Sequence, residues 1–171
     1  AWFQKNAEFD AQIRQLFLAD VEQAAAGDYD SWQASSRSAV ALLLLLDQFP
    51  RNLYRQDPRS FATDAKALQV AQSLVKTGAD RALTPAQRFF VYVPFEHSEL
   101  LIHQQRCVSL MSALNESFPE LDPGLKSGLD YAIRHRDVIA RFGRFPHRNE
   151  ILGRKSTPEE VLFLQQPGSR F

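Results

Sequence analysis

Residues 39–46 read Ala-Val-Ala-Leu-Leu-Leu-Leu-Leu, the longest uninterrupted apolar run in the chain. A helix that is apolar on every side is typical of a position enclosed by neighbouring helices. The run is much shorter than the ~20 residues that a helix needs to cross a bilayer. We therefore expect a central buried helix over about residues 31–47, and no membrane span.

Helix-start and helix-stop residues recur on both sides of this run. Residues 84–87 (Thr-Pro-Ala-Gln) and 157–160 (Thr-Pro-Glu-Glu) have the form of capping boxes with proline at the first helical position. Apolar residues elsewhere follow helical spacing. The expected helices cover about residues 6–27, 31–47, 58–78, 85–92, 95–115, 125–143 and 158–164. Short connections favour antiparallel hairpins, so we predict an all-α fold of about seven helices in one domain, residues 1–171.

Composition narrows the classes of function. The 171 residues carry 20 basic and 20 acidic side chains, so the chain lacks the net positive charge that attracts nucleic acid or anionic membranes. We expect neither as a partner. Cys107 is the single cysteine and cannot form an internal disulfide, and no signal-peptide pattern opens the sequence, so we expect a cytoplasmic protein. The oligomeric state is not indicated.

Two polar segments share a motif. Residues 141–154 read Arg-Phe-Gly-Arg-Phe-Pro-His-Arg-Asn-Glu-Ile-Leu-Gly-Arg, and residues 47–55 read Asp-Gln-Phe-Pro-Arg-Asn-Leu-Tyr-Arg. We interpret both as turns that leave the core sharply, because the residue before proline favours extended geometry. Guanidinium groups bind carboxylate or phosphate. The candidate ligand-binding residues are Arg51, Asn52, Arg144, Arg148, Asn149 and Arg154. The alternative is structural: these arginines would pair with Asp47, Glu96, Glu99 or Glu150.

A third polar cluster, Glu96-His97-Ser98-Glu99, opens the helix expected over residues 95–115. On that helix Glu96, Glu99, His103 and Arg106 would share one face, with His97 turned toward the core. A carboxylate that orients an imidazole suits acid-base chemistry. The candidate catalytic residues are His97 or His147 as the base, with Glu99 or Asp47 as the orienting carboxylate. His135 lies on an apolar stripe and is interpreted as a hydrogen-bonded core residue.

Other chemistry has weaker support. No Glu-x-x-His pair or His-Glu-x-x-His motif is present, so we expect no metal site. No glycine-rich phosphate loop appears, and we expect no cofactor. Ser98 is next to His97 in sequence, but adjacent residues on a helix do not face each other. Cys107 falls on an apolar helix face, where a thiol is usually inert.

Four segments together resemble a bacterial family of uncharacterised proteins that is grouped with the tetratricopeptide-repeat-like superfamily. They are Trp2-Phe3, Leu46-Asp47-Gln48-Phe49-Pro50-Arg51-Asn52, Pro94-Phe95-Glu96-His97-Ser98-Glu99 and Arg141-Phe142-Gly143-Arg144-Phe145-Pro146-His147-Arg148-Asn149. The ending over residues 152–160 fits as well. The resemblance covers nearly the whole chain and implies an all-helical, tetratricopeptide-like fold. It implies no function and no catalytic residue.

Three hypotheses follow. In the first, the two arginine turns face the His97 region across one hollow that binds a small anionic ligand or the carboxylate end of a peptide. In the second, the protein is a hydrolase or lyase with a histidine base, and whether it is an enzyme stays open. In the third, the chain is a scaffold for another protein, with an exposed apolar concave patch.

Overall fold

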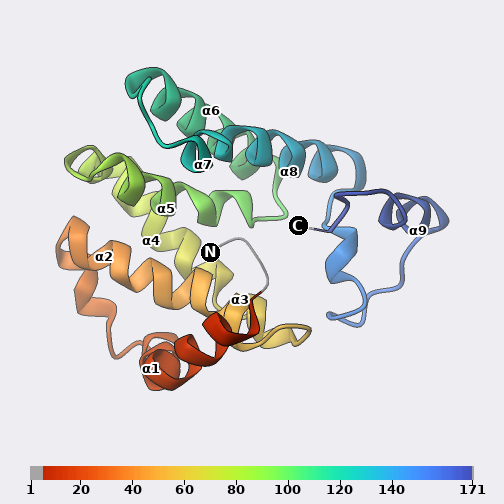
Figure 1. Cartoon of the computed structure of the whole chain (residues 1–171), viewed down its shortest axis with the longest axis horizontal. Helices are drawn as coiled ribbons and strands as arrows, with labels where there is room; N and C mark the ends of the chain where they lie inside the picture. The colour runs from red at the N-terminus through yellow and green to blue at the C-terminus, as the bar shows by residue number, and fades with distance from the viewer. Residues whose placement is uncertain (1–5, 171) are drawn as a thin grey trace. The chain divides into compact units, whose positions relative to one another are not determined.

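The computed structural model describes residues 6–170, and all the regular elements of these residues are helical (Figure 1). This confirms the predicted all-α class. The chain divides into two compact units, Ala1–Pro94 and Phe95–Phe171. The single domain expected from the sequence therefore stays a prediction. Trp2 and Phe3, which contribute to the family resemblance, lie outside the described residues.

The first helix of unit 1, α1, spans Ala7–Ala26. The side chain of Asn6 caps its start by accepting a hydrogen bond of 3.0 Å from the backbone N–H of Phe9. Gly27 ends it in the left-handed conformation, with φ 103°. Both ends agree with the sequence pattern, and α1 packs against the short helix α3 (Phe49–Leu53).

The apolar run lies in a longer helical stretch than predicted. Helix α2 (Ser36–Leu43) continues into a π-helical turn, η2 (Leu44–Gln48), and then into α3 (Phe49–Leu53). Asp47 and Gln48 are buried in the π-helical turn. The first arginine segment is therefore helical and buried at Phe49 and Pro50, so the prediction of a turn that leaves the core is wrong there.

Pro50 explains part of this irregular geometry. Proline has no N–H, so it cannot donate to the carbonyl oxygen of Leu46, four residues earlier, as an ordinary helical residue would. The Leu46 carbonyl instead accepts a hydrogen bond from the Thr63 hydroxyl. A π-helical turn often marks a functional segment. Here it places Asp47 and Arg51 beside the chain that follows α3.

Residues 57–78 form two elements, and not the single helix that was predicted. Asp57 caps the 3₁₀ turn η3 (Pro58–Phe61) by accepting a hydrogen bond of 2.8 Å from the Arg59 N–H. Helix α4 (Asp64–Thr77) follows and packs against α2. Two further 3₁₀ turns, η1 (Asp30–Ala34) and η4 (Ala79–Ala82), complete the connections of unit 1.

Helix α5 spans Pro85–Glu96 and continues through Pro94, where the sequence predicted a break. The boundary between the two units falls inside this helix, after Pro94. Residues 97–100 form the turn that follows it, and the next helix, α6, starts at Leu101. Glu96 and Glu99 therefore do not lie on one helix with His103 and Arg106, and the predicted shared face is wrong.

Unit 2 is built on a pair of long helices. Helix α6 (Leu101–Ser117) and helix α8 (Gly128–Phe142) pack side by side and run in opposite directions (Figure 1). The short helix α7 (Pro123–Lys126) precedes α8, and α9 (Pro158–Leu164) packs on the 3₁₀ turn η5 (Pro146–Arg148). A core cluster joins α8 to the segment after it, through Val138, Ile139 and Phe145.

Nine α-helical segments are present among residues 6–170. If α2 with α3, and α7 with α8, are each counted as one interrupted helix, the total is the predicted seven. No helix in this part of the chain combines the length and the apolar character that a membrane span requires.

Candidate functional site

The candidate residues fall in both units. Asp47, Arg51 and Asn52 lie in unit 1, while the remaining candidates lie in unit 2: His97, Glu99, Arg144, His147, Arg148, Asn149 and Arg154. The unit 2 residues come from two segments, the turn over residues 97–100 and the stretch from Gly143 to Thr157. We name this stretch the arginine loop.

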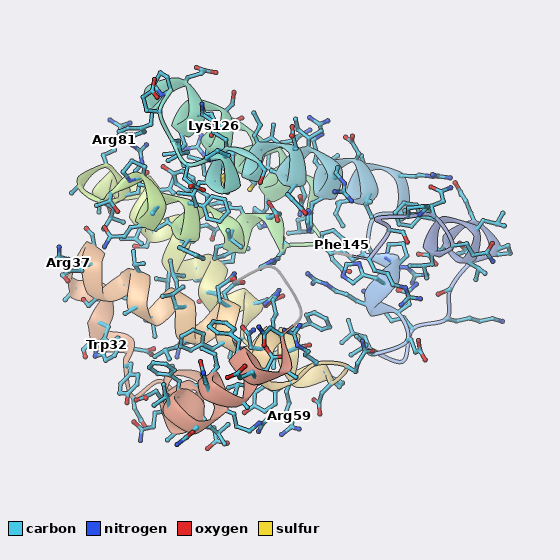
Figure 2. All side chains as sticks on the ribbon, in the orientation of Figure 1. Trp32, Arg37, Arg59, Arg81, Lys126 and Phe145 are labelled. Carbon is cyan, nitrogen blue, oxygen red and sulfur yellow. The ribbon has the colours of Figure 1, made fainter. Side chains whose placement is uncertain are left out.

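The arginine loop begins where α8 ends. Gly143 adopts the left-handed conformation with φ 68°, which glycine tolerates best, and turns the chain away from the helix axis. Phe145, labelled in Figure 2, is fully buried two residues later. The Phe145 N–H donates a hydrogen bond of 2.8 Å to the Glu99 carboxylate. The loop is thereby attached to the turn after α5.

The far end of the loop reaches the same carboxylate. Arg154 donates two hydrogen bonds to Glu99, of 2.7 and 2.9 Å, and a third of 3.1 Å to the Phe145 carbonyl. Partial burial acts to raise the pKa of Glu99, but the bonds from Arg154 and the Phe145 N–H, with the charges of Arg154 and Arg148, outweigh it and lower the pKa below its ordinary value. Glu99 is thus a charged anchor for both ends of the loop.

A second carboxylate, Glu160 at the start of α9, holds the outer side of the loop. It accepts bonds of 2.6 and 2.7 Å from Arg144, 3.2 Å from the Asn149 amide and 2.7 Å from the Thr157 N–H. The Arg144 bonds, with smaller contributions from Thr157 and Asn149, overcome burial and lower the pKa of Glu160 to about 2. The predicted capping box at Thr157 and Glu160 is present.

Imidazole and guanidinium groups surround Phe145. The His135 and His147 ring centroids each lie 5.5 Å from that of Phe145, and the Arg148 guanidinium carbon lies 4.5 Å from it. Arg148 is buried, while His147 is half-buried. A guanidinium over an aromatic face is a favourable cation–π geometry. The ring of Phe145 therefore gathers groups from α8 and from the arginine loop.

His135 is a member of this group and not only a core residue, as the sequence suggested. Burial, with the nearby positive charges of His97, His147 and Arg148, lowers its pKa well below 6.5, although a hydrogen bond to the Tyr131 carbonyl opposes the shift. The imidazole is therefore neutral at neutral pH. Its Nδ1 lies 3.5 Å from the Glu96 carboxylate, and because the imidazole is neutral the two groups do not form an ion pair.

The turn that carries His97 is fixed by Gln104 of α6. The Gln104 side-chain amide donates bonds of 2.6 Å to the carbonyls of both Glu96 and Ser98. Ser98 is hydrogen-bonded to His103 at 2.8 Å, and not to its sequence neighbour His97. The turn is thus tied to the first residues of α6.

We name His97, His135, His147, Arg148 and Arg154 the imidazole–guanidinium cluster. Electrostatic interactions connect its members: the charges of His97, His147 and Arg148 act on His135, and those of Arg148 and Arg154 act on Glu99. Guanidinium and protonated imidazole groups are donors for carboxylate and phosphate. Among the described residues, no group of three or more His, Cys, Asp or Glu side chains is arranged to hold a metal ion.

The unit 1 candidates make close internal contacts. Arg51 forms a two-bond pair with Asp64, at 2.8 and 2.9 Å, and also donates to the Asp47 carbonyl at 2.8 Å. Its distance to the Asp47 carboxylate is 3.5 Å. Gln48 donates to that carboxylate at 2.6 Å. Arg51 and Asp47 are therefore parts of one ion-pair network on α3 and the π-helical turn.

Asn52 belongs to a second unit 1 network, with Asp10 of α1. Its amide donates to Asp10 at 2.9 Å, and Arg55 donates to the same carboxylate at 2.5 and 2.8 Å. The Arg55 bonds, against a smaller effect of burial, lower the pKa of Asp10. This contact holds α3 against α1, a structural role that the sequence did not indicate.

The alternative interpretation was that the arginines form internal pairs with acidic residues, and several of these contacts are of that kind. Arg51 lies near Asp47 and Arg154 pairs with Glu99, as that alternative predicted, but Arg144 pairs with Glu160. The hollow expected between the two arginine segments would be lined by residues of both units. It therefore stays a prediction. The catalytic roles of His97, His147, Glu99 and Asp47 also stay predictions, as does the scaffold hypothesis.

Sequence reasoning missed three anchors of these networks: Glu160, Gln104 and Asp64. Glu160 was visible only as the third residue of a capping box, and its bonds to Arg144 span 16 positions. Gln104 was predicted only to lie on the inner face of the helix expected over residues 95–115. Neither residue type nor spacing indicates which backbone or side-chain groups these three residues bind.

The fold and these networks define an all-helical protein whose polar residues concentrate at two motif segments and one histidine turn. The chain belongs to the family described as bacterial protein of unknown function (DUF924), which matches residues 1–168. It is similar to a solved structure of a protein of unknown function from Agrobacterium tumefaciens, with 41% sequence identity and a TM-score of 0.84. That match covers 96% of this chain and 88% of the other. No curated protein matches the chain.

Proposed function

We propose that the protein binds a small anionic molecule, or the carboxylate end of a peptide, at the imidazole–guanidinium cluster of unit 2. The observation that carries this proposal is the gathering of Arg148, His147 and His135 around the single ring of Phe145. Arg148 and His147 would donate to the anion. Because Arg148 is buried, its charge acts through a medium of lower dielectric constant than water.

Arg154 and Asn149 support the binding groups through hydrogen bonds that hold the arginine loop. Arg154 positions Glu99 and the loop ends, and Asn149 positions Glu160 and Ser156. Arg51, Asn52 and Arg144 are engaged with Asp64, Asp10 and Glu160, respectively. We place the binding role on Arg148 and His147, which lie at the Phe145 ring, and on His97, whose charge acts on His135 beside that ring. The other candidates have a supporting role in this proposal.

The proposal also covers the superfamily and the cellular location of the protein. The antiparallel pair of α6 and α8 is the type of element from which tetratricopeptide-like folds are assembled, and supports membership of that superfamily. A cytoplasmic location is supported by the single cysteine, Cys107, whose buried side chain cannot form an internal disulfide.

A thermal-shift and calorimetric screen with acetate, succinate, phosphate and short peptides tests the binding proposal. We expect at least one of these anions to stabilise the wild type. Replacing Arg148 by methionine should weaken that anion at least about tenfold, because a charged hydrogen bond to the ligand is lost. Arg148→Lys should recover part of the affinity through its charge.

Arg141→Met is the matched control, because it removes the same charge from an exposed α8 residue that pairs with Glu159. It should leave anion affinity unchanged. The proposal fails if no anion stabilises the wild type, or if Arg141→Met weakens binding as much as Arg148→Met does.

A further inference from the structure

We propose that the contact between His135 of α8 and Phe145 of the arginine loop is a pH-sensitive switch, in which a proton taken up by His135 favours release of the loop from α8. The inference goes beyond the proposed function and does not depend on it. It is carried by the position of the buried imidazole, by the positive groups gathered at the same phenyl ring, and by the carboxylates that hold the loop.

His135 is buried where α8 meets the arginine loop. The residue is 5% exposed, and its ring meets the Phe145 ring edge to face, with centroids 5.5 Å apart and planes at 78°. Val138 and Ile139 of α8 form a core cluster with the same Phe145. Release of Phe145 therefore exposes the imidazole to water, and its pKa then returns toward the ordinary 6.5.

The hydrogen bond of the ring determines which nitrogen takes up the second proton. Nδ1 lies 2.8 Å from the Tyr131 carbonyl oxygen, which can only accept, so Nδ1 carries the proton of the neutral imidazole. The Glu96 carboxylate lies 3.5 Å from the same nitrogen. The second proton is therefore added at Nε2, and not at the nitrogen that faces Glu96.

The charged and titratable groups around His135 come from several segments. They are Glu96 at the end of α5, His97 in the following turn, Cys107 of α6 beside Glu96, and His147 and Arg148 of η5. Glu96 favours the charged imidazole, as does the Tyr131 carbonyl, but burial and the three positive groups outweigh them and lower the pKa of His135 well below 6.5. Burial raises the pKa of the Cys107 thiol well above 9.0, so that group stays neutral.

The loop brings positive groups to the ring that His135 contacts. The Arg148 guanidinium carbon lies 4.5 Å from the Phe145 ring centroid, and the His147 ring centroid lies 5.5 Å from it. A proton on His135 adds a like charge at this ring, where repulsion is stronger than in water. Because the pKa of His135 is lower with the loop in place than after release, a fall in pH favours release.

The two carboxylates that hold the loop change charge in a lower pH range. The pKa of Glu160 is about 2, and that of Glu99 lies below its ordinary value of 4.5. Both stay ionised between pH 7.5 and 5.5, so their bonds to Arg144 and Arg154 keep their charges. A change of the loop in this range is therefore assigned to an imidazole and not to these anchors.

Hydrogen exchange of the wild-type full chain at pH 7.5 and 5.5, corrected for the intrinsic pH dependence of exchange, tests the inference. For one imidazole that titrates at its ordinary pKa after release, opening of residues 143–157 should become about tenfold more frequent at pH 5.5. Residues 104–114 inside α6 are the internal reference and should change less than about twofold. Unchanged protection of the loop, or an equal loss in α6, overturns the inference.

Two variants assign the response to His135. His135→Asn keeps an N–H for the Tyr131 carbonyl, and His135→Phe keeps an aromatic ring against Phe145, but neither side chain takes up a proton. The tenfold response should be lost in both. His103→Asn is the matched control, because His103 is bonded to Ser98 in the turn before α6, and it should keep the response.

A folded His135 variant that keeps the full response overturns the inference, as does loss of the response in His103→Asn alone. If neither His135 variant folds, an NMR titration of the wild type replaces them. The amide signals of residues 143–157 should then change with the same midpoint as the His135 ring. A midpoint that matches another histidine and not His135 overturns the inference.

Discussion

At the scale of the residue, two carboxylates organise the candidate site. Glu99 joins the two ends of the arginine loop, and Glu160 joins its outer side to α9. Each accepts charged hydrogen bonds from one arginine and a further bond from a backbone N–H. These contacts help to place Phe145 and Arg148, so in the proposed function the two carboxylates act by positioning the loop.

The substitution Glu160→Gln tests this role. It preserves the shape of the side chain but removes the charge that Arg144 faces, and we expect a loss of about 2 kcal/mol in the free energy of unfolding. Urea denaturation at neutral pH measures it. Glu159→Gln is the control, because Glu159 is exposed and its partner Arg141 is exposed too, and it should cost under about 0.5 kcal/mol. Equal losses would contradict the anchor role.

Glu160 should also make the stability of the protein depend on pH. The pKa of Glu160 is about 2 in the folded chain, below its ordinary value of 4.5. A lowered folded pKa means that the stabilisation is complete above pH 4.5 and is lost as the pH falls toward 2. The difference in unfolding free energy between wild type and Glu160→Gln should therefore shrink over this range. A difference that stays constant from pH 6 to pH 3 would contradict the assignment.

At the scale of the element, the interruption between α2 and α3 is the main irregularity of unit 1. The π-helical turn and Pro50 leave the Leu46 carbonyl to Thr63, which lies just before α4. The Thr63 hydroxyl thus binds a backbone carbonyl of the central helix and connects that helix to the next one. The buried Asp47 lies within this turn.

A double-mutant cycle tests that explanation. Thr63→Val keeps the volume but removes the donor, and should cost about 1 kcal/mol by urea denaturation. In a Pro50→Ala background residue 50 regains an N–H, so the same change should cost less. Identical costs in the two backgrounds would show that Pro50 does not create the need for the Thr63 hydroxyl.

At the scale of the whole molecule, the chain forms two compact units joined within one helix, α5. The networks of Glu160 and Thr63 each lie within one unit. Whether the units open separately determines whether the chain behaves as one domain, because domains unfold as cooperative units.

Hydrogen exchange measured by mass spectrometry distinguishes these cases. In Glu160→Gln we expect faster exchange concentrated in residues 143–164, and in Thr63→Val concentrated in residues 36–77, because each lost bond lies in its own unit. Wild type under the same conditions is the reference. Faster exchange spread equally over both units by either substitution would indicate a single cooperative domain.

Much of the helical architecture could be predicted from local patterns. The ends of α1 and α9 follow from Asn6, Gly27 and the capping box at Thr157, which are interactions between residues three or four positions apart. The predictions failed at Pro50 and Pro94. Proline is a poor helix residue by itself, but tertiary packing and a distant donor can satisfy the freed carbonyl, and no local pattern contains that donor.

The sequence by itself predicted the all-helical class, and it indicated the residue types of the candidate site. Only the tertiary structure decided which acids hold which arginines, and that His135 joins His147 and Arg148 at the ring of Phe145. The physical reason is the range of the interactions. Helix formation depends on neighbours within one or two turns, whereas the bonds from Arg154 and Phe145 to Glu99 join residues about fifty positions apart.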